Sequence, residues 1–117
     1  IESEGLLENA TAQGDFALER LSKFQLNHPS LVRLEGRGLM VGLEFMDAHG
    51  KPLPEFRDEV VNQAYLKGLL TLGCGVGSLR IAPPLMIDRK LMSEGLDILE
   101  RAIAEVEESH YELLMQN

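Results

Sequence analysis

Arg80 carries the clearest chemical signal in the sequence. It lies in the alternating segment Ser78–Ala82, between a glycine-rich run at 73–77 and the pair Pro83-Pro84. A guanidinium offers a planar fork of donors that matches a carboxylate, and it stays charged at any physiological pH. The pattern therefore allows two interpretations: Arg80 binds the carboxylate of a ligand, or it forms a structural ion pair with Glu44 on the same sheet face.

The other residues that could do chemistry give weaker signals. The glycines at 73–77 do not match a phosphate-binding loop, because no lysine follows them and no helix opens from them. Arg37 lies between two glycines and could contact an anion, although a turn arginine is more often simply exposed. Cys74 has no basic neighbour in the sequence that would activate its thiol. The histidines lack metal-ligand spacing; they are His28, His49 and His110. Taken alone, these residues indicate a binding element without a complete catalytic site.

Period-two patterns predict two pairs of strands. Leu69–Leu72 and Ser78–Ala82 flank the glycine-rich run and form a predicted hairpin, in which Arg80 points away from the core face. Leu31–Glu35 and Leu39–Met46 flank a second glycine turn. The last of these strands has an apolar face and a mixed face, which are Leu39, Val41, Leu43 and Phe45 against Met40, Gly42, Glu44 and Met46.

Helical periodicity predicts three amphipathic helices around these strands. The first begins near Leu7 and ends before Pro29, with an apolar stripe at Leu7, Ala10, Ala17, Leu18, Leu21 and Phe24. Gly14 lies on that stripe, where it would permit the close approach of another element. The second begins at Pro54 and ends at 67–68, with a stripe at Phe56, Val60, Val61, Ala64 and Tyr65.

The third helix is expected to be capped by Asp88, and it continues or frays within 109–117. Its predicted apolar stripe is Leu91, Gly95, Leu99, Ala102, Ile103 and Val106. Its opposite face is expected to be solvated, and it carries Glu94, Asp97, Glu100, Arg101, Glu105 and Glu107.

The order of these elements predicts an α+β fold. We expect a mostly antiparallel sheet of about four short strands, covered on one face by the three helices. The other face carries Arg80, Glu44 and Met40 and is left uncovered, which indicates that something else covers it.

Composition limits the classes of function. With 117 residues and 44% hydrophobic content, the chain fits one domain with a modest core. A formal charge of −8 argues against a nucleic-acid partner and against a polybasic membrane contact. One cysteine permits no internal disulfide, and no apolar run approaches the length of a membrane span. We therefore expect a cytoplasmic protein, and the first residue, Ile1, suggests an excised piece.

Four spaced motifs then make the sequence similar to a known family. They are VRLEGRGLMVGLE at 32–44, KGLL at 67–70, LRIAPPL at 79–85 and EGLDILE at 94–100. In this order they resemble the C-terminal part of class III pyridoxal-phosphate aminotransferases, which include the 4-aminobutyrate, ornithine and acetylornithine aminotransferases. The resemblance runs from Gly5 to Val106.

This resemblance implies that residues 1–117 form the small C-terminal domain of a fold-type-I enzyme that works as a homodimer. It implies that Arg80 binds the carboxylate of the amino-acid or 2-oxo-acid substrate. It also implies that a large domain holds the cofactor, pyridoxal 5′-phosphate, because no lysine of this chain lies in the family's lysine motif: Lys23, Lys51, Lys67 and Lys90. The chain would position the substrate and be inactive alone.

Within that family, the sequence is interpreted as part of an enzyme that moves an amino group from an ω-amino acid to 2-oxoglutarate, as 4-aminobutyrate aminotransferase does. An ornithine or acetylornithine aminotransferase is the alternative, since the loop at 75–78 is more compact than in 4-aminobutyrate enzymes. Two hypotheses outside this class are a free-standing module that binds carboxylates and an interaction domain whose bare sheet face pairs two copies.

Overall fold

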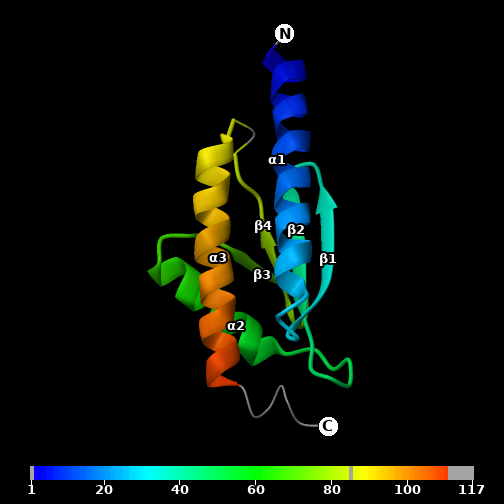
Figure 1. Ribbon diagram of the computed structural model, residues 1–117, viewed down its shortest axis with the longest axis vertical. Helices are drawn as coiled ribbons and strands as arrows, with labels where there is room; N and C mark the ends of the chain where they lie inside the picture. Colours follow the sequence, from blue (N-terminus) through cyan, green and yellow to red (C-terminus); the bar gives the residue numbers. More distant parts are fainter. Residues whose placement is uncertain (1, 85, 111–117) are drawn as a thin grey trace.

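The computed structural model describes residues 2–84 and 86–110, which form three helices and four strands (Figure 1). In chain order these are α1 (Glu2–Gln25), β1 (Leu31–Arg37), β2 (Met40–Phe45), α2 (Pro54–Leu66), β3 (Leu72–Cys74), β4 (Ser78–Ile81) and α3 (Arg89–Ser109). Neighbouring strands are antiparallel, and their order in the sheet is β1-β2-β4-β3. The predicted α+β class is confirmed.

The two central strands bury one face of the sheet because their side chains alternate. Val41 and Leu43 of β2 and Leu79 of β4 are at most 1% exposed, and Leu43 pairs with Leu79 across the strands. Successive side chains of a strand point to opposite faces. The neighbouring pair, Gly42 and Arg80, therefore lies on the other face of the sheet.

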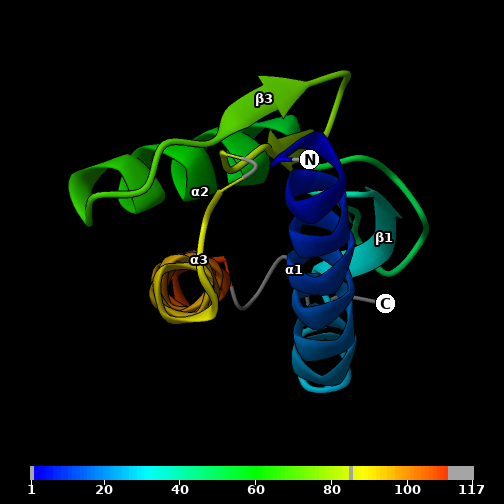
Figure 2. The same cartoon turned by 90° about the horizontal axis from the view of Figure 1, so that it is seen from above.

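All three helices cover the buried face. α1 contacts β1, β2 and α3, while α2 contacts α3 and the three strands β2, β3 and β4. Seen from above, α1 and α3 stand on the same side of the sheet and α2 runs alongside β3 (Figure 2). The expectation that the helices share one face is confirmed. Within the described residues, no helix combines the length and the apolar character that crossing a membrane requires.

The strand β3 begins later than the sequence predicts. A strand was expected at Leu69–Leu72, but the structure has it at Leu72–Cys74. Gly68 follows α2 with a φ of 101°, and the N–H of Leu69 donates to the carbonyl of Ala64 at 2.8 Å. These residues complete the C-terminal end of the helix. Their backbone is therefore not free to join the sheet.

The start of α2 and the cap of α3 follow the prediction, whereas α1 begins at Glu2, before the expected start near Leu7. α2 begins at Pro54, and the carboxylate of Asp88 caps α3 by accepting a hydrogen bond from the N–H of Leu91 at 2.8 Å. Tyr65 was expected on the apolar stripe of α2 but is exposed. The expected continuation of α3 through 111–117 lies outside the described residues.

The apolar stripe of α3 is rotated by one residue in its first half. Met92 and Leu96 are buried, whereas Leu91 is exposed and Gly95 has no side chain to bury. From Leu99 onward the expected and the observed buried residues are the same, because three- and four-residue steps from either starting point lead to the same helical face. The larger side chains occupy the core.

Gly14 brings α1 into direct contact with the turn between β1 and β2. A Cβ added at Gly14 would lie 1.7 Å from the carbonyl oxygen of Gly38, which no side chain could tolerate. The predicted close approach is therefore confirmed. Gly38 itself has a φ of 56°, a conformation that glycine adopts at little cost. Leu7, expected on the same stripe, is exposed, since the N-terminal turns of α1 project beyond the sheet (Figure 1).

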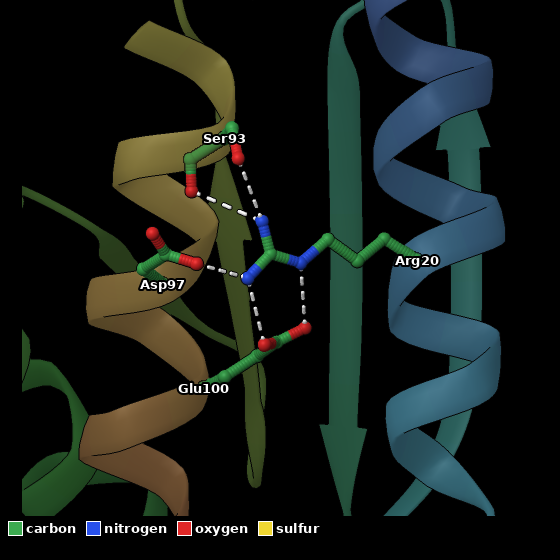
Figure 3. A network of polar contacts seen from close by, with 4 residues as sticks. All are labelled: Arg20, Ser93, Asp97 and Glu100. Atoms are coloured by element: carbon green, nitrogen blue, oxygen red, sulfur yellow. Dashed lines mark hydrogen bonds and ion pairs between the residues drawn. The ribbon is translucent and has the colours of Figure 1, made fainter. Parts of the chain in front are cut away.

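Arg20 ties α1 to α3 through a network of polar contacts (Figure 3). Its Nε and Nη2 atoms donate to the two carboxylate oxygens of Glu100 at 3.1 and 2.9 Å, and Nη2 also binds Asp97. Nη1 donates to the carbonyl and the hydroxyl of Ser93, both at 3.1 Å. The hydrogen bond to Glu100 is the largest cause of a raised pKa at Arg20. Charge-assisted hydrogen bonds therefore hold the side chain of Arg20 against α3.

Glu107 makes a second tie, between α3 and the segment that joins α1 to β1. It accepts a hydrogen bond from the N–H of Ser30 at 3.2 Å and also binds the hydroxyl of Ser30 and Nδ1 of His28. The ring of His28 stacks on Phe24, with 3.7 Å between centroids. The expectation that the acidic face of α3 is solvated is therefore wrong at Glu100 and Glu107, whose side chains are 19% and 12% exposed because partners from distant parts of the chain cover them. Asp97 is exposed, as expected, although it also pairs with Arg20.

We predict that Gly14→Ala destabilises the fold by about 1–3 kcal/mol, because the new methyl group overlaps the Gly38 carbonyl. This cost should outweigh the helix-propensity gain of about 1 kcal/mol that the same change brings. The measurement is the free energy of unfolding in urea. Gly5→Ala is the matched control, since nothing lies within 4 Å of a Cβ there, and it should not destabilise. Equal effects of the two variants would contradict the contact.

We also predict that Arg20→Met lowers the free energy of unfolding by about 1–3 kcal/mol, because it leaves the carboxylate of Glu100 without its partner. Since the pKa of Arg20 is raised, its contribution persists below its unfolded pKa and is lost only as pH rises through the folded value. The cost should therefore be the same at neutral and mildly alkaline pH. Lys23→Met is the control: Lys23 is 75% exposed and pairs with Glu19 at 3.4 Å, so it should cost less than about 0.5 kcal/mol.

Candidate functional site

The uncovered face of the sheet is hollowed into a shallow depression. Its volume is about 800 Å³, and strands β1 to β4 all contribute to its lining: Arg33, Glu35, Gly36, Met40, Gly42, Leu43, Glu44, Cys74, Ser78 and Arg80. The even-numbered residues of β2 and β4 reach this face because the odd-numbered ones fill the core. The depression is therefore a product of the same alternation that builds the fold.

Arg80 lies near the middle of this face. Its strand, β4, pairs with β2 on one side and β3 on the other, so that Arg80 stands between Gly42 and Leu72. The side chain is exposed, and within residues 2–84 and 86–110 it forms no hydrogen bond or ion pair. The carboxylate of Glu44 instead lies 3.9 Å from Nε of Arg33. The expected alternative, an ion pair between Arg80 and Glu44, is wrong, because register places Glu44 opposite Ser78.

Gly42 keeps the space beside Arg80 open. Its φ does not lie in the left-handed region, and an added Cβ would meet nothing closer than the carbonyl oxygens of Glu35 and Leu79 at 4.0 Å. Neither the backbone nor the packing therefore requires glycine here. What the missing side chain changes is the width of the depression between Glu35 and the guanidinium.

The loop of the hairpin is shaped by two of its glycines. Gly75 has a φ of 57°, as expected for a turn that needs a left-handed residue. Gly77 is packed so closely that an added Cβ would lie 3.0 Å from the N atom of Leu53 and from the carbonyl oxygen of Phe45. The carbonyl of Gly77 accepts a hydrogen bond from the N–H of Phe45 at 3.0 Å. The loop is therefore attached to β2 at the point where β4 begins.

Arg57 is the residue of this region that sequence reasoning missed. It lies in the first turn of α2, and its Nη1 donates to the backbone carbonyls of Cys74 at 3.0 Å and Ser78 at 2.6 Å. A charged residue on the same helical face as the buried residues Leu53 and Val60 was the signal that could have identified it. These two partners are backbone carbonyls, which the sequence does not reveal.

The remaining candidates do not form a catalytic group. Cys74 is half-buried and lines the depression, without a hydrogen-bonded base among the described residues. His110 binds Glu59 at 3.0 Å and lies elsewhere in the fold. The described residues contain no cluster of side chains that could hold a metal ion. Arg37 lies in β1, and its side chain is outside the described part of the chain.

The depression is not suited to hold pyridoxal phosphate by itself. No lysine is among its lining residues, so it offers no amine for a Schiff base. Lys67, the lysine nearest the hairpin in sequence, is ion-paired with Glu105 at 2.7 Å. What the depression offers is a guanidinium without a partner in the described part of the chain, carried by an inner strand of the sheet, and this suits an anionic group such as a carboxylate.

Comparison with known proteins identifies the family. The model of the family "Aminotransferase class-III" matches residues 1–103. The leucine/methionine racemase of Thermococcus litoralis is 38% identical over 111 residues, which are 92% of this chain and 25% of that protein. The 4-aminobutyrate aminotransferase of Mycobacterium leprae is 32% identical over 108 residues, which are 90% of this chain and 24% of that protein.

Solved structures agree with this assignment. The lysine aminotransferase of M. tuberculosis superposes with a TM-score of 0.79 at 27% identity, over 91% of this chain and 23% of that chain. The chain belongs to the class III aminotransferase family, as its motifs indicated. It spans about a quarter of the length of the relatives that it matches.

We predict that Arg80→Ala leaves the free energy of unfolding within about 0.5 kcal/mol of the parent value, since the side chain is exposed and unpaired in the described structure. The measurement is urea unfolding of both proteins. A loss of about 2 kcal/mol or more would mean that Arg80 supports the fold and would weaken its assignment to a ligand.

Proposed function

We propose that this chain is the C-terminal small domain of a pyridoxal-phosphate-dependent aminotransferase, and that Arg80 binds the substrate carboxylate. One observation carries the proposal: a strand arginine without a partner among the described residues faces an open depression on the side of the sheet that no described helix covers. Membership of the class III family supplies the kind of substrate, because transamination acts on amino acids and 2-oxo acids.

The contribution of this chain to the reaction is binding and orientation. The two outer nitrogens of Arg80 match the two oxygens of a carboxylate, so one side chain fixes both the position and the rotation of that group. Holding a substrate in the reactive orientation lowers the barrier by removing freedom before the chemical step. The strand beneath Arg80 is hydrogen-bonded on both sides, which keeps the Cα of the arginine in place.

The cofactor and the chemical step belong to the rest of the enzyme in this proposal. The depression lacks a lysine, and the chain covers about a quarter of its relatives, which leaves room for a large domain. When bound there, pyridoxal 5′-phosphate supplies the electron sink for amine chemistry. The large domain would cover the open face, and the whole enzyme would work as a homodimer. The chain alone is then inactive.

For the substrate, we propose an ω-amino acid as donor and 2-oxoglutarate as acceptor. The similarity to a 4-aminobutyrate aminotransferase supports this choice.

A racemase of α-amino acids is the second candidate, because the relatives at 34% and 38% identity carry that name. Incubation with one enantiomer of an amino acid separates the two: a racemase produces the other enantiomer without 2-oxoglutarate, whereas an aminotransferase produces glutamate only in its presence.

We predict that Arg80→Ala in the intact enzyme raises the KM for the 2-oxo-acid half-reaction by about tenfold or more, because a charge-assisted bidentate contact is lost. The cofactor absorbance should be retained, since the large domain binds the cofactor. Arg101→Ala is the matched control: Arg101 is also exposed and unpaired among the described residues, but it lies on α3.

Unchanged kinetics in Arg80→Ala would refute the carboxylate role.

Calorimetry of the isolated chain with 2-oxoglutarate tests the alternative of a free-standing module. Heat of specific binding favours the module, and its absence agrees with a site completed by the large domain.

A further inference from the structure

We propose that Arg57 is a positioning residue that acts through Arg80. It lies on the helix-covered side of the sheet and holds the β3–β4 hairpin in the shape that directs Arg80 into the depression. This inference rests on the proposed carboxylate role of Arg80.

The contacts of Arg57 join the two ends of the hairpin loop. Nη1 donates to the carbonyl of Cys74, the last residue of β3, and to the carbonyl of Ser78, the first residue of β4, at 3.0 and 2.6 Å. Nε donates to the carboxylate of Asp58 at 2.7 Å. The side chain of Arg57 is 12% exposed, whereas that of Asp58 is 70% exposed. The two carbonyl contacts are therefore the more sheltered ones, and hydrogen bonds from a charged donor are the stronger kind.

The backbone of β3 is fitted to this guanidinium. A Cβ added at Gly73 would lie 3.2 Å from Cζ and Nε of Arg57 and 3.3 Å from Nη1, which is tighter than ordinary contact. Gly73 does not have a positive φ, so its conformation is open to other residues. The absence of a side chain at Gly73 instead leaves the space that the guanidinium of Arg57 occupies beside the hairpin.

The hairpin needs such a contact because it is short. β3 has three residues and is an edge strand, paired only with β4 among the described strands. β4 is also held by β2, so β3 is the strand whose position depends on few contacts. Arg80 pairs with Leu72 at the open end of the hairpin, two residues after Ser78. A change in the angle of the hairpin at its loop therefore moves β3 and with it Leu72, the residue beside which the side chain of Arg80 extends.

A double-mutant cycle in the intact aminotransferase tests this coupling. The variants are Arg57→Met, Arg80→Ala and the double variant, and the readout is the KM and kcat for a 2-oxo acid. We expect Arg57→Met to lower kcat/KM by about tenfold, mainly through KM, in the parent enzyme. In the Arg80→Ala enzyme the same change should lower it by less than about twofold, since the group through which it acts is gone.

Three further variants separate the carbonyl contacts of Arg57 from its charge and from its ion pair. Arg57→Lys keeps one charged donor and should restore part of the loss. Asp58→Asn removes the charge of the exposed partner, keeps its acceptor oxygen, and should leave the kinetics unchanged. Gly73→Ala keeps Arg57 but crowds its guanidinium, so it should raise KM in the same direction, and it serves the cycle if Arg57→Met does not fold. The melting temperature of each variant is recorded beside its kinetics.

Two results would overturn the proposal. Equal fold-losses for Arg57→Met in the parent and in the Arg80→Ala enzyme would show that Arg57 acts independently of Arg80. Parent kinetics in both Arg57→Met and Gly73→Ala would show that the hairpin does not need the contact. If Arg80→Ala itself has no effect, the carboxylate role of Arg80 fails, and the inference about Arg57 fails with it. Because each single variant is measured, the cycle distinguishes failure of the Arg80 role from failure of the Arg57 role alone.

Discussion

The burial of one face of a four-stranded sheet is the constraint from which the rest of the structure follows. Val41, Leu43 and Leu79 pack against three helices, and this packing supplies much of the hydrophobic stabilisation. Because side chains alternate along a strand, the same packing places Gly42 and Arg80 on the opposite face. A shift of register by one residue would exchange core and surface. The exposure of Arg80 is thus maintained by side chains that pack on the opposite face of the sheet.

The sequence predicted those features of the fold that depend on neighbours along the chain. Alternation in β2 identified the buried face, and Gly14 marked the approach of α1 to the turn after β1. Two of the errors concern the start of a strand and the phase of a helix. The start of β3 was misplaced, since the backbone of Leu69 closes α2 and is not available to the sheet. The first half of the stripe of α3 was misplaced as well, because a helix tolerates either of two neighbouring phases and only packing selects between Leu91 and Met92.

The candidate site was predictable to a similar extent. Pattern alone placed Arg80 on the uncovered face, and the family resemblance gave it a role that stays a prediction. Arg57 and Arg20 were not found, because their partners are distant in the sequence or are backbone carbonyls. Glu100, eighty residues from Arg20, was expected to face solvent for the same reason. Charged residues on helices are usually solvated, so only coordinates distinguish the minority that join two elements.

The place of β4 inside the sheet has a consequence for the way this scaffold could accept ligands of different length. An inner strand has hydrogen-bonded neighbours on both sides, so its backbone does not slide or tilt by itself. The position of the guanidinium can therefore change only by rotation about the side-chain bonds of the arginine. The arginine side chain is long and has several such bonds. On the proposed carboxylate role of Arg80, short and long acids would be bound by different rotamers above the same backbone, and a change of substrate would not require a change of the core.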